Sequence, residues 1–147
     1  MARKVFFSFK YKDVQRAMNV RQSGVITANE KAGFIDAADF EKVKAQGDRA
    51  IQNWIDNQLH GTSVTVVLIG AETNQSRWVQ YEIDKSISRG NGLLTVDISK
   101  IADFDRQTST YCGMKVKGYP HYQWNNDDGR LNLGTWIEAA AKAAGKP

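Results

Sequence analysis

One stretch of the chain decides the fold: Val64-Thr65-Val66-Val67-Leu68-Ile69, a largely apolar and β-branched run that stops at Gly70. A run without regular polar alternation is typical of a strand covered on both faces, as in a parallel sheet. The runs Val5–Phe9 and Gly92–Ile98 have the same character. Together they predict three buried strands of one sheet.

Helical patterns separate these strands. Apolar residues recur at helical spacing from Phe40 to Leu59, although the first part of that pattern, up to Gly47, can also be interpreted as a loop. Ser76 is a candidate N-cap for a helix from Arg77 to Arg89. Each strand is therefore expected to be followed by a helix that covers it.

The remaining segments are short or weakly patterned. Asp13 can cap a short helix that ends near Arg21, and Gly33–Asp36 has the composition of a short second strand. Thr135–Glu138 matches a capping box, which predicts that the last helix begins there and runs to about Gly145. The stretch from 99 to 132 shows no pattern that places a strand.

Strands that alternate with helices predict a three-layer, flavodoxin-like α/β domain with a mostly parallel central sheet. The chain has 147 residues, of which 41% are hydrophobic and 24% charged, as in ordinary globular proteins. We see no internal repeat and no linker, so a single domain over residues 1–147 is expected.

Charge and composition exclude several classes of function. The net charge is +4, but the basic residues are interleaved with acidic ones and form no continuous stripe, so no nucleic-acid partner is expected. No apolar run approaches the roughly 20 residues of a membrane helix, so no membrane partner is expected either. The single cysteine, Cys112, cannot form an internal disulfide, which suits a reducing, cytoplasmic location.

A tryptophan and a glutamate stand out on the helix after the central strand. Trp78 and Glu82 are four residues apart and share one face, near the carboxyl edge where parallel sheets bind ligands. Glu82 flanks the apolar stripe of that helix, and partial burial would raise its pKa, as in many catalytic carboxylates. The alternative is that Trp78 packs in the core and Glu82 pairs with Lys85 or Arg89 in solvent.

Common catalytic motifs give little else. No glycine-rich loop of the Rossmann or P-loop type follows a strand. His60, His121 and Cys112 lack the spacing of metal ligands, so no metal is expected. A nucleophilic pair of Cys112 and His121 stays open, although a lone loop cysteine is more often inert.

Four segments, in this order, resemble the strands and helix that characterise TIR domains: Val5–Phe9, Gly33–Asp36, Ser63–Gly70 and Trp78–Ile83. The last is similar to the Trp-x-x-x-Glu segment that carries the catalytic glutamate of NAD-cleaving TIR proteins. Among TIR-like domains, the chain is most similar to the prokaryotic group of the Thoeris anti-phage TIR protein. The resemblance runs from Val5 to about Ile98.

This resemblance implies an NAD glycohydrolase or ADP-ribosyl cyclase with Glu82 as its catalytic residue. The enzyme would release nicotinamide and form a cyclic ADP-ribose-type signal for a separate effector protein. NAD is then the substrate, no cofactor is needed, and self-association is expected.

The chemistry of NAD explains how one carboxylate could suffice. Nicotinamide leaves as a neutral molecule and needs no general acid, so an anion that stabilises the positive charge on the ribose is enough. Aromatic side chains could stack on a ring of NAD, and short polar ones could hydrogen-bond its ribose or phosphates. The candidate substrate-binding residues are Phe9, Tyr11 and Trp78 for stacking, and Ser8 and Asp36 for hydrogen bonds.

Two other functions remain open from the sequence. One is a TIR scaffold or interaction module that assembles without catalysis. The other is an enzyme similar to nucleoside deoxyribosyltransferases, which also place a glutamate against a ribose.

Overall fold

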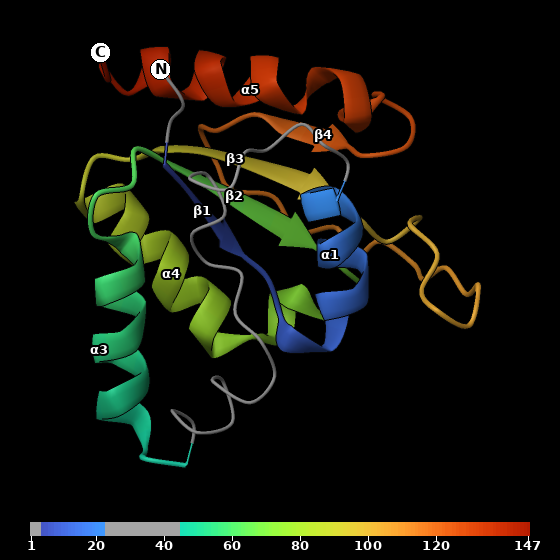
Figure 1. The fold of residues 1–147 in the computed structure, drawn as a ribbon, viewed down its shortest axis with the longest axis horizontal. Helices are drawn as coiled ribbons and strands as arrows, with labels where there is room; N and C mark the ends of the chain where they lie inside the picture. Colours follow the sequence, from blue (N-terminus) through green and yellow to red (C-terminus); the bar gives the residue numbers. More distant parts are fainter. Residues whose placement is uncertain (1–3, 23–44) are drawn as a thin grey trace.

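The computed structural model describes residues 4–22 and 45–147 and shows a sheet between layers of helices (Figure 1). Its strands are β1 (Val5–Ser8), β2 (Val64–Ile69), β3 (Gly92–Asp97) and β4 (His121–Gln123). Its α-helices are α1 (Val14–Gln22), α3 (Asp48–Leu59), α4 (Arg77–Ser88) and α5 (Gly129–Ala143). Two short 3₁₀ turns, η1 (Tyr11–Asp13) and η3 (Thr73–Gln75), follow β1 and β2.

The described strands form one parallel sheet in the order β1-β2-β3-β4. Every residue of β1, β2 and β3 is buried, as the apolar runs predicted. Their carboxyl ends lie at one edge, where Ser8 pairs with Val67, and Ile69 with Asp97. The α/β class and the three strands predicted from the sequence are confirmed.

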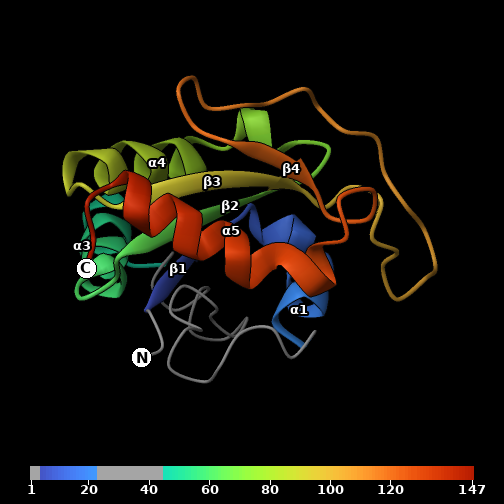
Figure 2. The same ribbon diagram turned by 90° about the horizontal axis from the view of Figure 1, so that it is seen from above.

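Helices cover both faces of the sheet (Figures 1 and 2). Side chains alternate along each strand, so Phe7 joins the large cluster under α1 and α5, whereas Phe6 faces α3 and α4. Beneath β2 and β3, a second cluster on the α4 side contains Val79 and Ile83. Ser8 lies two residues after Phe6, so its side chain belongs to the α4 face.

The helix ends follow the chemistry of their capping residues. The Ser76 hydroxyl accepts a hydrogen bond from the backbone N–H of Val79 at 3.2 Å, which confirms the predicted N-cap of α4. Gly47, immediately before α3, has φ 97°, a conformation that favours glycine. The loop interpretation therefore holds up to Gly47, at least for the described residues from 45 onward; Phe40 lies outside them.

The predicted start of the last helix is wrong. Helix α5 begins at Gly129, and Thr135 is an exposed residue in its interior rather than its N-cap. The early turns form because Leu133 buries its side chain against the sheet and Gly129 packs on the ring of Trp124. Tertiary packing thus overrides the weak helix propensity of Asn132 and Gly134.

Three other sequence predictions concern a strand after β3, the first helix and the segment Gly33–Asp36. The structure adds β4 within the stretch where no strand was predicted, and the strand's three residues are only half-buried. Helix α1 begins directly after Asp13, as expected. The predicted strand Gly33–Asp36 lies outside the described residues.

Among the helices described in the structure, none combines the length and the apolar character that crossing a bilayer would require.

Two matched alanine substitutions, one at the N-cap of α4 and one inside α5, test whether Thr135 is an N-cap. Ser76→Ala removes a real N-cap and should lower the free energy of unfolding by about 1 kcal/mol. Thr135→Ala lies inside a helix, where alanine has the higher propensity, so it should leave stability unchanged or raise it by up to about 0.5 kcal/mol. Urea unfolding of both variants measures these changes. A loss of stability in Thr135→Ala equal to that in Ser76→Ala would mean that Thr135 is an N-cap.

Candidate active site

A buried glutamate lies where β1 meets α4. Glu82 is only 9% exposed, and its Oε1 accepts a hydrogen bond of 2.7 Å from the Ser8 hydroxyl. Ser8 is the last residue of β1 and is fully buried. Two residues that are 74 positions apart in sequence are thereby joined at the carboxyl end of a strand.

Burial controls the ionisation of this carboxyl group. Loss of solvent raises the pKa of Glu82 to about 8, and the hydrogen bond from Ser8 opposes that rise. No ion pair with Glu82 occurs within residues 4–22 and 45–147. The carboxyl group is therefore mostly protonated at neutral pH until something cationic approaches it.

The backbone of α4 is fixed to the sheet at the same point. The Ser86 hydroxyl donates to the carbonyl oxygen of Glu82 at 2.7 Å and lies 2.7 Å from the Thr65 hydroxyl on β2. Asn91 donates to Thr65 from the turn after α4. These contacts hold the helix in register under the strand, and the sequence reasoning did not find them. Helical spacing offered one signal, because Ser86 follows Glu82 by one turn.

The alternative position of Glu82 in solvent is wrong. Lys85 lies over the ring of Tyr81, 5.9 Å from its centroid, and Arg89 donates to the carbonyl oxygen of Leu59 at 2.9 Å. Neither cation pairs with Glu82, because the carboxyl group turns inward to Ser8. The buried face of α4 consists of Val79, Glu82, Ile83 and Ser86.

Trp78 packs one turn before Glu82 in the direction of α3. It is half-buried against the cluster of Phe6 and the α3 side chains, with its ring 5.8 Å from Tyr81 in an edge-on arrangement. The guanidinium of Arg77 covers the indole at 4.5 Å. The packing role considered for Trp78 is confirmed, and its stacking on a substrate stays a prediction.

The other predicted substrate-binding residues are less closely grouped. Phe9 is half-buried and packs against the cluster under α1 and α5, the opposite side of the sheet from Glu82. Tyr11 is half-buried at the start of η1. Asp36 lies outside the described residues. Of the predicted set, the structure therefore joins Ser8 to Glu82 and places Trp78 one helical turn away.

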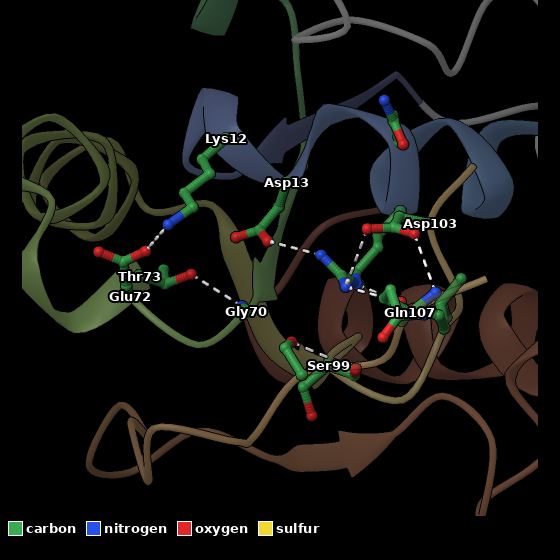
Figure 3. A network of polar contacts seen from close by, with 12 residues as sticks. Lys12, Asp13, Gly70, Glu72, Thr73, Ser99, Asp103 and Gln107 are labelled. Carbon is green, nitrogen blue, oxygen red and sulfur yellow. Dashed lines mark hydrogen bonds and ion pairs between the residues drawn. The ribbon is translucent and has the colours of Figure 1, made fainter. Parts of the chain in front are cut away.

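A second buried polar network holds the carboxyl edge together, and Figure 3 shows it from close by. Arg16 is within 3.5 Å of the Asp13 carboxylate and donates to the carbonyl oxygens of Ile101 and Gln107 at 2.8 and 2.9 Å. These bonds tie α1 to the segment after β3. The sequence reasoning missed this network, although the spacing of Asp13 and Arg16 suits a pair on one helical face.

Gly70 shows how tightly this edge is packed. A Cβ atom at Gly70 would lie 2.2 Å from Oδ2 of Asp13, far inside van der Waals contact. The backbone N–H of Gly70 donates to the Thr73 hydroxyl at 2.8 Å (Figure 3). The Asp13 carboxylate, at the end of η1, can therefore pack directly on the backbone after β2 because position 70 has no side chain.

The described residues contain no group of three histidine, cysteine, aspartate or glutamate side chains that could hold a metal. His121 lies 2.7 Å from the Thr95 hydroxyl through Nδ1 and stacks on Tyr111. Cys112 packs against the apolar cluster on the α4 side. The contacts that the structure shows for His121 and Cys112 are thus packing and hydrogen bonding with other partners.

The parallel sheet, with a buried glutamate on the helix after β2, defines a TIR-like α/β domain. Residues 6–103 match the family model described as Thoeris protein ThsB, TIR-like domain. The chain belongs to this family, as its resemblance implied. A relative in Bacillus cereus (strain MSX-D12), ThsB1, is named as a candidate cyclic ADP-D-ribose synthase. It is 40% identical over 144 residues, which cover 92% of this chain and 72% of the relative.

The raised pKa of Glu82 makes stability depend on pH. The folded protein keeps a proton on Glu82 up to about pH 8, whereas the unfolded chain loses it near the ordinary pKa of 4.5. Between these values the folded state binds more protons, so the free energy of unfolding should fall with rising pH by up to about 1.4 kcal/mol per pH unit. Glu82→Gln should abolish this contribution, which urea unfolding from pH 5 to pH 8 measures.

Ser8→Ala supplies the matched comparison. It removes the donor that lowers the pKa of Glu82, so the carboxyl signal of Glu82 in a ¹³C NMR titration should move to a higher midpoint. An unchanged or lower midpoint in this variant would contradict the assigned hydrogen bond.

Proposed function

We propose that this protein is an NAD-cleaving TIR enzyme that releases nicotinamide and forms a cyclic ADP-ribose-type signal in anti-phage defence. The observation that carries the proposal is the buried Glu82 carboxyl group, oriented by Ser8 at the carboxyl end of β1. Membership of the Thoeris ThsB family and the name of the B. cereus relative support the same activity. NAD is the substrate in this proposal, and no cofactor is required.

The charge of NAD matches the state of the site. Glu82 is mostly neutral without substrate because burial raises its pKa. The nicotinamide ring of NAD carries a positive charge, and a nearby cation favours the ionised carboxylate. Binding of NAD would therefore release the Glu82 proton to solvent and create the anion at the moment it is needed.

The reaction follows from that ion pair. When the bond between ribose and nicotinamide breaks, its electrons leave with nicotinamide, which becomes neutral, and positive charge moves to the ribose. A fixed carboxylate in a site that excludes water stabilises this charge more than bulk water would. Ser8 keeps the carboxylate oriented, because its hydroxyl donates to the ionised as well as to the neutral form.

The fate of the ribose carbon depends on which nucleophile reaches it. Water gives ADP-ribose, whereas an atom elsewhere in the same molecule closes a ring and gives the cyclic product. If that atom is a hydroxyl oxygen, the proton that it loses can pass to the Glu82 carboxylate. In this proposal the cyclic product leaves and activates a separate effector protein, and self-association of the chain helps to exclude water from the site.

The proposal is tested by incubating purified protein with NAD and measuring nicotinamide and cyclic product by mass spectrometry. Glu82→Gln keeps the size of the side chain but removes its charge, and release of nicotinamide should fall by at least about 100-fold. Asp84→Asn removes an exposed charge from the same helix and should leave release unchanged.

Each other outcome has its own meaning. Equal release by Glu82→Gln and the unchanged protein would remove Glu82 from the mechanism. Self-association at high protein concentration with no release would favour the scaffold function. Release of free bases from deoxynucleosides, but not of nicotinamide from NAD, would indicate a deoxyribosyltransferase.

The pH dependence of the reaction provides a separate prediction. The profile of kcat/KM reports the free enzyme, so it should rise with pH through about 8, the pKa of Glu82 without substrate. The profile of kcat reports the complex, in which the cationic ring lowers that pKa, so its rise should lie at a lower pH. Coincident profiles would contradict ionisation of Glu82 by the substrate.

A further inference from the structure

A second candidate site lies at the same sheet edge, at the ends of β3 and β4. A cavity of about 150 Å³ opens there, and the residues that line it include Asp97, Tyr111, Gln123 and Trp124. The carboxyl edge of a parallel sheet is where ligands of open α/β proteins bind. None of these residues contributes to the contacts around Glu82.

Asp97 brings a hydrogen-bond acceptor to this cavity. Its side chain ends β3 and is only 6% exposed, and one oxygen, Oδ1, accepts the backbone N–H of Ser99 at 2.8 Å. Within the described residues no donor bonds the other oxygen, Oδ2, and no cation lies within ion-pair distance of the carboxylate. Because Asp97 lines the cavity, this oxygen can accept hydrogen bonds from a ligand that enters it.

The remaining walls suit a nucleoside. Tyr111 and Trp124 supply aromatic surface. Gln123 accepts a hydrogen bond from Asn126 through Oε1, at 2.6 Å, so its amide N–H groups are the atoms that this side chain can offer to a ligand. A single carboxylate can accept hydrogen bonds from the two neighbouring hydroxyls of a ribose. Acidic residues near strand ends bind ribose hydroxyls in this way in dinucleotide-binding sheets.

The cavity is also at a suitable place relative to Glu82. In the strand register, Asp97 lies two strands away from Ser8 and two residues nearer the carboxyl edge. With about 4.8 Å between strands and about 3.3 Å per residue, the two positions are roughly 12 Å apart. This separation is comparable to the span between the two sugars of an extended dinucleotide.

We infer that this cavity binds the adenosine half of NAD, with Asp97 accepting hydrogen bonds from the two ribose hydroxyls. The inference rests on the proposed function in taking NAD as the ligand. Glu82 then acts on the nicotinamide ribose at β1, while Asp97 holds the other ribose at β3. Asp97 is a binding residue here and takes no part in bond breaking.

The test uses the full chain with Glu82→Gln, so that no turnover occurs, and two probes, AMP and 2′,3′-dideoxy-AMP. Calorimetry should show that AMP binds about tenfold or more tightly than the dideoxy probe, because only AMP has hydroxyls for Asp97. In E82Q/D97N that preference should disappear. Asparagine can still accept the Ser99 N–H, so folding should be retained, as circular dichroism can check.

E82Q/D105N is the matched control, since Asp105 is an exposed aspartate outside the cavity, and it should keep the full preference for AMP. Absence of AMP binding, or a preference for AMP that survives Asp97→Asn, would overturn the inference. These results do not depend on catalysis. If AMP binding depends on the hydroxyls but the unchanged protein releases no nicotinamide, this site is supported and the proposed reaction is refuted. If the unchanged protein releases nicotinamide but AMP binding does not depend on the hydroxyls, this site alone is refuted.

Discussion

The hydrogen bond between Ser8 and Glu82 is the interaction on which the candidate site depends. It joins the end of β1 to the middle of α4 and holds an acid in a largely buried position. The same burial that makes the carboxyl group neutral at rest makes it responsive to a cationic ligand. In the proposed reaction, substrate charge, rather than a second protein group, prepares the site.

The parallel sheet determines where such chemistry can occur. All described strands end at one edge, so residues far apart in sequence, such as Ser8 and Asp97, become neighbours along that edge. The Arg16 network and the close approach at Gly70 keep the edge compact on the side of α1. Two carboxyl groups with different surroundings can therefore address different parts of one extended ligand.

Much of the fold could be predicted from the sequence because the strands are fully buried. The stretch Val64–Ile69 has boundaries that its composition alone defines, and Ser76 marks the start of α4 by its capping chemistry. The last helix was misplaced because its first turns are stabilised by contacts with Trp124, which no local pattern reveals. The strand His121–Gln123 escaped detection because it is short and only half-buried.

The site was predictable only in part, for a similar reason. Helical spacing placed Glu82 beside the apolar stripe, but its burial and its bond to Ser8 depend on how β1 packs over α4. Arg16 holds the segment after β3 through the carbonyl groups of Ile101 and Gln107, not through their side chains. The hold of Arg16 on positions 101 and 107 is therefore independent of the side chains there, whereas lysine, which lacks the planar fork of arginine, is a poor replacement at position 16.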